Sequence, residues 1–150
     1  MRSGPQAQAS SSILLVDDNR DGNMARRSVL EELGYEVLSA TSGKDALKAI
    51  EQRACDLVVT DYKMTPMNGV ELIAKLRERE FKKPIILLTG FAESLGLKPE
   101  NTGADIVLQK CSNEVATLVR HTKRLLAVPR KPARSQGTPK TALRSKGENA

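Results

Sequence analysis

Five short apolar runs alternate with five segments that have the apolar spacing of helices, and this order constrains the fold more than any other feature. The apolar runs are residues 13–16, 35–40, 57–60, 84–88 and 103–109, and the helical segments are 21–33, 42–52, 69–76, 91–99 and 112–128. Short apolar runs closed by turn residues are typical of strands buried on both faces of a parallel sheet. We therefore predict an α/β fold in which helices cover both faces of a five-stranded parallel sheet.

The first and the fourth predicted helices differ in how regular their sequences are. In the first, apolar residues recur largely on one helical face, which we expect to face the core: Met24, Val29, Leu30 and Leu33. In the fourth, Gly96 and the nearby Pro99 disfavour a regular helix, so we expect a short or mobile segment over residues 91–99.

The length of 150 residues suits one domain, which we place at residues 12–128. Residues 1–11 have the composition of a disordered leader, and residues 129–150 that of a disordered basic tail. The net charge of +6 lies almost entirely in this tail, since basic and acidic residues balance within the domain. The tail is either a solvated linker or an electrostatic attachment to an acidic partner, but no aromatic residue in it would stack on nucleic acid.

Other common classes of protein find little support. No apolar run approaches the roughly 20 residues of a membrane span, and the N-terminus lacks the apolar centre of a signal peptide. Cys55 and Cys111 have no neighbours at metal-ligand spacing, so we interpret them as reduced thiols. The single histidine, His121, has no partner nucleophile motif. We expect a soluble, cytoplasmic protein.

Polar residues with a shared chemistry follow the predicted strands. Asp17 and Asp18 follow the first strand, Asp61 ends the third, Thr89 follows the fourth, and Lys110 follows the fifth. Ligands bind at the carboxyl ends of parallel strands, so these residues are expected to converge. Three close carboxylates need a positive partner, and oxygen ligands alone favour Mg²⁺. Together with Lys110 and Thr89, such an ion could stabilise a phosphoryl group carried on Asp61.

On these residues the chain resembles the receiver domains of two-component response regulators. The resemblance covers residues 12–128 and rests on Leu-Val-Asp-Asp-Asn at 15–19, Thr-Asp-Tyr-Lys-Met at 60–64, Met-Asn-Gly at 67–69, Leu-Thr-Gly at 88–90, Gly-Ala-Asp at 103–105 and Lys110. It implies a doubly wound, flavodoxin-like sheet of order 2-1-3-4-5. The implied roles are phosphoacceptor for Asp61, Mg²⁺ ligands for Asp17, Asp18, Asp61 and the backbone carbonyl of Lys63, switch hydroxyl for Thr89, and phosphoryl-binding amine for Lys110.

Three positions differ from the pattern that this resemblance leads us to expect. Val107 stands three residues before Lys110, where the family usually has an aromatic residue. Cys111 replaces the usual proline after the lysine, and many members form a cis peptide there. The proline of the loop after Asp61 is displaced by one residue, to Pro66.

The resemblance also implies partners. The phosphodonor would be a histidine kinase or phosphotransfer protein, or a small molecule such as acetyl phosphate, and the output would be binding of a downstream protein or relay of the phosphoryl group. A phosphorylation-dependent homodimer stays open. The chain would be no enzyme beyond assisting its own phosphorylation and dephosphorylation. The alternatives are a phosphorylation-independent interaction scaffold and an aspartyl phosphohydrolase, although the latter place a second Asp where this chain has Lys63.

Overall fold

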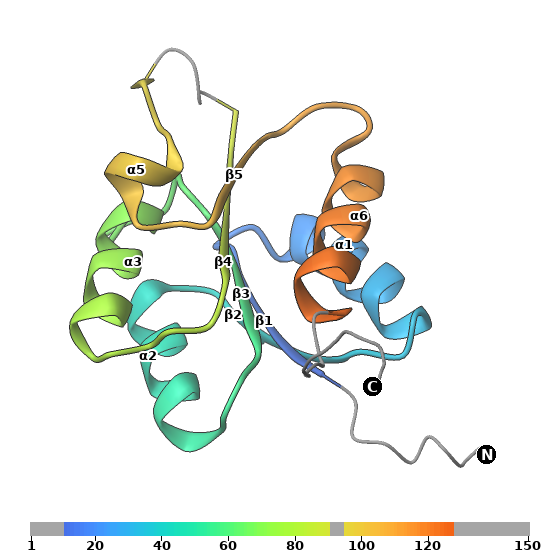
Figure 1. Cartoon of the computed structure of the whole chain (residues 1–150), viewed down its shortest axis with the longest axis horizontal. Coiled ribbons are helices and arrows are strands. Elements are labelled where there is room, and N and C mark those ends of the chain that lie inside the picture. Colours follow the sequence, from blue (N-terminus) through green and yellow to red (C-terminus); the bar gives the residue numbers. More distant parts are fainter. Residues whose placement is uncertain (1–10, 91–94, 128–150) are drawn as a thin grey trace, which may run out of the picture. The chain divides into compact units, whose positions relative to one another are not determined.

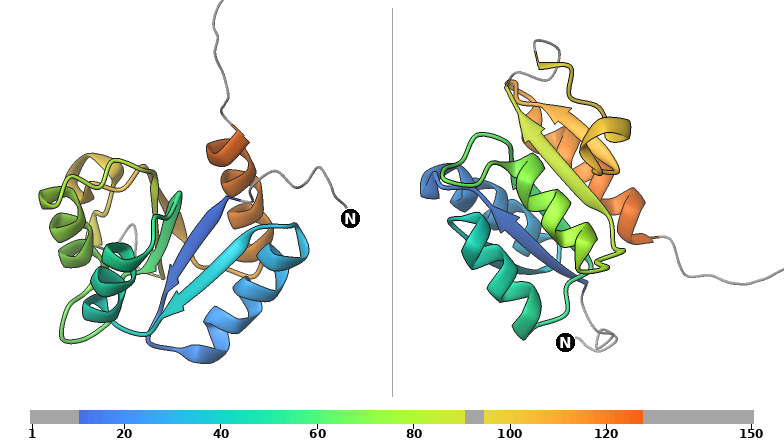
Figure 2. Two further views of the ribbon diagram at one scale, coloured as in Figure 1. Left: turned by 90° about the horizontal axis from the view of Figure 1, so that it is seen from below. Right: turned by 90° about the vertical axis from the view of Figure 1, so that its left-hand side faces the viewer.

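The computed structural model describes residues 11–90 and 95–127 of the chain. Five strands form one parallel sheet in the order β2-β1-β3-β4-β5, and Figures 1 and 2 show them side by side. Their bounds are Ser12–Val16 (β1), Glu36–Ala40 (β2), Leu57–Asp61 (β3), Ile85–Thr89 (β4) and Ile106–Gln109 (β5). The predicted fold class and strand order are therefore confirmed.

Helices lie on both faces of this sheet. Their bounds are Arg20–Glu32 (α1), Gly43–Gln52 (α2), Gly69–Glu78 (α3), Pro99–Thr102 (α5) and Glu114–Ala127 (α6). Figure 1 shows α2, α3 and α5 on one face, and α1 with the beginning of α6 on the other. The chain divides into two units, residues 1–119 and 120–150, so that α6 begins in the first unit and continues into the second.

The three central strands form the centre of the core. Every residue of β1, β3 and β4 is buried. Alternate side chains of a strand point to opposite faces, so each strand contributes to two layers of packing. Towards α2 and α3 the strands bury Leu14, Val16, Val58, Ile85 and Leu87 against Leu72, Ile73 and Leu76. Burial on both faces is why these strands are continuous apolar runs.

The predicted core face of α1 was wrong at two of its four positions. Met24 is 63% exposed and Leu33 is 43% exposed, whereas Leu30 is buried as expected. The buried face instead carries Asn23 and Arg26 together with Leu30. Apolar spacing failed here because two polar residues have partners inside the domain.

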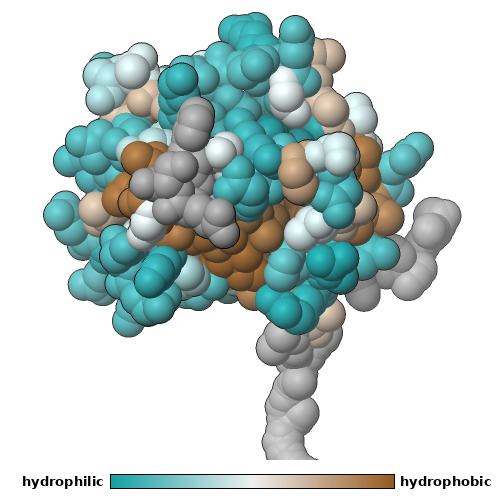
Figure 3. Space-filling model, turned by 90° about the horizontal axis from the view of Figure 1, so that it is seen from above, coloured by the Kyte–Doolittle hydropathy of each residue, from teal (hydrophilic) through white to brown (hydrophobic). Residues whose placement is uncertain are grey.

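On the face seen in Figure 3, hydrophobic residues gather in one area that hydrophilic residues border.

The segment between β4 and β5 also differs from the prediction. Residues 91–94 of the predicted fourth helix lie outside the described residues. Pro99, which we expected to end that helix, begins α5, since proline suits the first position of a helix. Gly103 caps α5 with φ +82° instead of opening the last strand, which begins at Ile106.

Most of the predicted leader and all of the predicted tail lie outside the described residues, so the domain bounds stay predictions. Both cysteines are free, and burial raises the pKa of the Cys55 thiol to about 11. Among the described residues, no helix combines the length and apolar character that crossing a membrane requires.

The loop after Asp61 is held close to the end of β3. The backbone N–H of Gly69 donates to the carbonyl of Tyr62 at 2.8 Å, and Asn68 caps α3 in a reciprocal capping box with Glu71. A Cβ atom on Gly69 would collide with the backbone carbonyl of Asp61. In the described part of the chain the only cis peptide is Thr65–Pro66, so the Lys110–Cys111 peptide is trans.

We predict that Gly69→Ala lowers the free energy of unfolding by about 1–3 kcal/mol, because the added methyl group must displace the end of β3. Chemical denaturation followed by circular dichroism measures this change. Gly90→Ala is the matched control, since a Cβ atom there meets nothing within 4 Å. Equal stability of the two variants would contradict the prediction.

Candidate phosphoacceptor site

Adjacent strand ends place the candidate residues at one edge of the sheet. Asp17 and Asp18 directly follow β1, and Asp61 is the last residue of β3, which lies next to β1. Thr89 is the last residue of β4, on the other side of β3. The backbone N–H of Lys110 donates to the carbonyl of Thr89 at 2.8 Å, which fixes the start of the lysine at the same edge.

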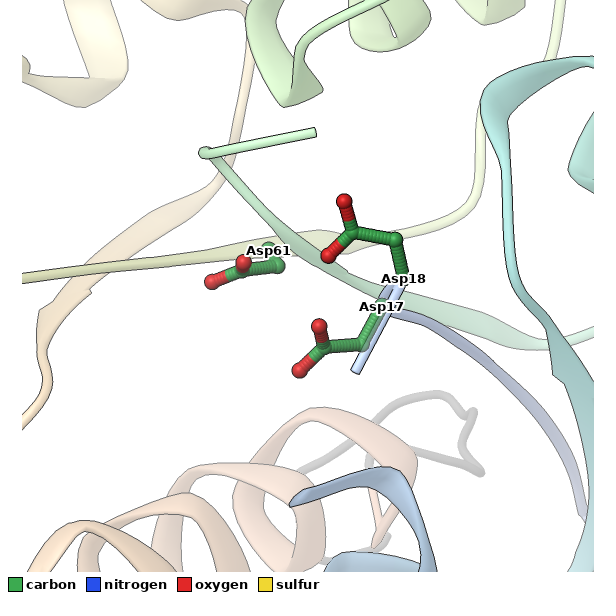
Figure 4. A group of neighbouring side chains, drawn as sticks. All are labelled: Asp17, Asp18 and Asp61. Atoms are coloured by element: carbon green, nitrogen blue, oxygen red, sulfur yellow. The ribbon is translucent and has the colours of Figure 1, made fainter. Parts of the chain in front are cut away.

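The three carboxylates converge as predicted. Each of Asp17, Asp18 and Asp61 offers an oxygen, and these oxygens all lie within 4.8 Å of one another (Figure 4). Asp17 and Asp61 are buried, whereas Asp18 is exposed. The ammonium of Lys110 contacts Asp61 Oδ1 at 2.5 Å. The sheet therefore brings together two acids from one strand end, a third acid from the next, and a lysine.

Thr89 and Lys63 complete the wall of the same pocket. A cavity of about 270 Å³ is lined by Asn19, Gly90 and all six of the predicted site residues: Asp17, Asp18, Asp61, Lys63, Thr89 and Lys110. Among the described residues, the pocket offers three carboxylates and is lined by neither cysteine nor histidine, which fits Mg²⁺. The residues present therefore fit the ion that the sequence predicts.

The electrostatics of the pocket act most strongly on Asp61. Burial raises the pKa of the Asp61 carboxyl, the nearby Asp17 charge raises it further, and the hydrogen bond and charge of Lys110 oppose both effects. The pKa of Asp61 is higher in the folded than in the unfolded chain. Protonated Asp61 therefore stabilises the folded state at low pH, and this contribution is lost as pH rises through the folded-state pKa. The positive charge of Lys110 thus favours the ionised form of Asp61.

Sequence reasoning missed two residues of this neighbourhood. Arg26 Nη1 donates to Asp17 Oδ2 at 2.8 Å, and Arg26 Nε donates to Glu114 Oε2 at 2.6 Å. Glu114 lies in the first turn of α6, within the first unit. The sequence spacing could have indicated Arg26, because it lies one helical turn before the buried Leu30 and therefore on the same, core-facing side of α1.

A larger cavity of about 560 Å³ lies elsewhere, between α1, α2 and the end of β2. The described residues that line it include Met24, Arg27 and Lys48, and Asp45 is the one acid among them. Size alone would place a site there, but the convergent acids and Lys110 lie in the smaller pocket. Chemistry therefore locates the candidate site at the carboxyl ends of the strands.

We predict that two substitutions move the pKa of Asp61 in opposite directions. Lys110→Met raises it, because the hydrogen bond and charge that oppose burial are lost, whereas Asp17→Asn lowers it, because a like charge is removed. Carbon-detected NMR titration of the Asp61 carboxyl measures both changes. A shift of the same sign in the two variants would contradict this account of the pocket.

Comparison with known proteins shows which family the chain is similar to. The family described as the response regulator receiver domain matches residues 13–122. The chain is 35% identical over 102 residues to the alkaline phosphatase synthesis transcriptional regulatory protein PhoP of Bacillus subtilis, and this match covers 65% of the chain and 41% of that protein. It is 40% identical over 83 residues to the sensor protein EvgS of Escherichia coli, covering 55% of the chain and 7% of EvgS. The chain therefore spans less than half the length of these relatives.

Solved structures are similar over most of the described fold. The response regulator TrrA from Thermotoga maritima, in complex with Mg²⁺ and BeF, has a TM-score of 0.68 and 32% identity, covering 77% of this chain and 98% of TrrA. The receiver domain of the sensor histidine kinase PA1611 from Pseudomonas aeruginosa, with a magnesium ion in its active-site cleft, has a TM-score of 0.70 and 28% identity, covering 79% and 98%. The chain thus belongs to the response-regulator receiver domains of two-component signalling.

Proposed function

We propose that this chain accepts a phosphoryl group on Asp61 and signals through the modified form. The observation that carries the proposal is the convergence of three acids, within 4.8 Å of one another, on a pocket in which Lys110 contacts Asp61 at 2.5 Å. The intact set favours a phosphoacceptor over the alternative of a phosphorylation-independent scaffold.

In the proposed reaction, a carboxylate oxygen of Asp61 attacks the phosphorus of a phosphohistidine or of acetyl phosphate. The new oxygen–phosphorus bond forms as the bond to imidazole nitrogen or to acetate oxygen breaks, and the leaving group departs with that electron pair. Lys110 already contacts Oδ1 of Asp61, so its ammonium needs only a small movement to neutralise a phosphoryl oxygen. The Thr89 hydroxyl, at the same pocket, would donate to another.

Asp17, Asp18, Asp61 and the backbone carbonyl of Lys63 would hold a Mg²⁺ ion in this pocket. When bound, the ion supplies positive charge that offsets the repulsion between the acids and the charge of the incoming phosphoryl group. Asp17 is buried and fixed, because its Oδ1 accepts from the backbone N–H of Asn19 at 2.9 Å. Asp18 is exposed, so it is the acid that can adjust to the ion.

The family and its relatives suggest the partners. A histidine kinase or phosphotransfer protein would be the donor, and a downstream protein or a second phosphotransfer protein would receive the signal. We propose no activity on free phosphoesters, since Lys63 stands where an aspartyl phosphohydrolase has its second Asp. A homodimer of the phosphorylated form and a cytoplasmic location stay predictions.

We predict that the chain becomes phosphorylated by acetyl phosphate in the presence of Mg²⁺, and that Asp61→Asn reduces this at least about 100-fold because the nucleophile is lost. A phosphate-affinity gel measures the modified fraction. Asp45→Asn, an exposed acid in the first turn of α2, is the matched control and retains phosphorylation. Modification that persists in Asp61→Asn would contradict the assignment, and absence of modification in the unsubstituted chain would favour the scaffold.

We also predict that Mg²⁺ stabilises the unphosphorylated chain, by about 2.7 kcal/mol at a concentration of 100 times its Kd. Asp18→Asn removes most of this stabilisation, because the exposed carboxylate contributes to the site without supporting the core. Thermal unfolding at increasing MgCl₂ measures both effects, with Asp45→Asn again as the control. Equal stabilisation of Asp18→Asn and the unsubstituted chain would exclude Asp18 as a ligand.

A further inference from the structure

The buried guanidinium of Arg26 lies between the acidic pocket and α6. Its side chain is 7% exposed, that of Asp17 is 2% exposed, and that of Glu114 is 13% exposed. Arg26 donates to Asp17 through Nη1, and to Glu114 through Nε at 2.6 Å and Nη2 at 3.4 Å. One charged group thus links an acid of the proposed Mg²⁺ site to an acid of a different helix.

Arg26 keeps its charge in this position. A guanidinium stays protonated in proteins, and the carboxylates of Glu114 and Asp17 both accept hydrogen bonds from this one. A buried charge without partners is strongly destabilising, so Arg26 must retain at least one of its two carboxylates. Because Arg26 also has two contacts with Glu114, its contact with Asp17 can weaken without leaving the guanidinium charge unpaired.

A Mg²⁺ ion and Arg26 would draw on the same carboxylate. The two cations repel each other, and each lowers the negative potential that Asp17 offers to the other. Lys110 has the corresponding relation to Asp61, at 2.5 Å. Arg26 differs from Lys110 because it has a second carboxylate partner, Glu114, which lies outside the pocket on α6.

We propose that Arg26 is a positioning residue that shares its charge between Asp17 and Glu114 and competes with Mg²⁺ for Asp17. Filling of the acidic pocket is then coupled to the contact between Arg26 and the first turn of α6. The proposal rests on the proposed Mg²⁺ site, and coupling between two sites is reciprocal. Any change that strengthens the hold of Glu114 on Arg26 therefore favours Mg²⁺, and any change that weakens it disfavours Mg²⁺.

Two substitutions should change Mg²⁺ affinity in opposite directions. Arg26→Gln removes the competing charge while keeping an amide donor, so Mg²⁺ binds about tenfold more tightly. Glu114→Gln leaves Asp17 as the one carboxylate partner of Arg26, so Mg²⁺ binds about fivefold more weakly. The double variant Arg26→Gln/Glu114→Gln binds as tightly as Arg26→Gln alone, because Glu114 acts through Arg26.

The measurement is a MgCl₂ titration of the unphosphorylated full chain, followed by the amide NMR shifts of Asp18 and Asn19. Arg27→Gln is the matched control, since Arg27 follows Arg26 on α1 but pairs with Glu31 instead. It should change affinity less than twofold. The Nε–H resonance of Arg26 gives a second readout, which shifts on Mg²⁺ binding in the unsubstituted chain and keeps its protection from exchange through Glu114.

The outcomes separate the two proposals. No Mg²⁺ binding by the unsubstituted chain would refute the proposed metal site. Normal binding combined with weaker or unchanged affinity in Arg26→Gln would overturn the role of Arg26 and leave the metal site standing. Should Arg26→Gln fail to fold, Glu114→Gln decides: weaker Mg²⁺ binding supports the competition, and unchanged or tighter binding overturns it.

Discussion

The crowding of negative charge at one edge of the sheet is the constraint on which the rest of this structure depends. Three carboxylate oxygens lie within 4.8 Å of one another, two of them on buried residues. Burial is the main cause of the raised pKa of Asp61, and the negative charge of Asp17 raises this pKa further. Lys110 offsets the charge of Asp61, and Arg26 that of Asp17. The positive side chains therefore belong to the site as much as the acids do.

The parallel sheet makes this crowding unavoidable. Because β1, β3 and β4 are neighbours with the same direction, the residues that end them meet at one edge. The fully buried apolar strands hold those ends rigidly, and Gly69 lets the loop after Asp61 pass close to the end of β3. A rigid edge keeps the acids together at an electrostatic cost that a flexible loop would relieve. A divalent ion and a phosphoryl group suit such a site, since the ion adds positive charge to the pocket and the phosphoryl group adds negative charge.

Much of this arrangement could be read from local pattern. Runs of four or five apolar residues ending in Asp17 or Asp61 indicate buried strands and the position of the acids, independently of the partners of those residues. The error in α1 arose because long-range partners override the local apolar pattern. Met24 has apolar character but is 63% exposed, because Asn23 and Arg26 take the inner face of α1 through contacts with Leu15 and with Asp17 and Glu114. Pro99 was taken as a helix breaker but begins α5, since proline suits a first turn.

The sequence by itself determined the order of strands and helices, the acids and lysine at the strand ends, and hence the family. These features depend on short stretches of chain, whose periodicity and turn residues are local. Only the tertiary structure decided which cation neutralises which acid. Arg26 and Glu114 are 88 residues apart, and their contact exists because the sheet brings α1 and the first turn of α6 together. Pairing of buried charges depends on such distances in space, which no local pattern encodes.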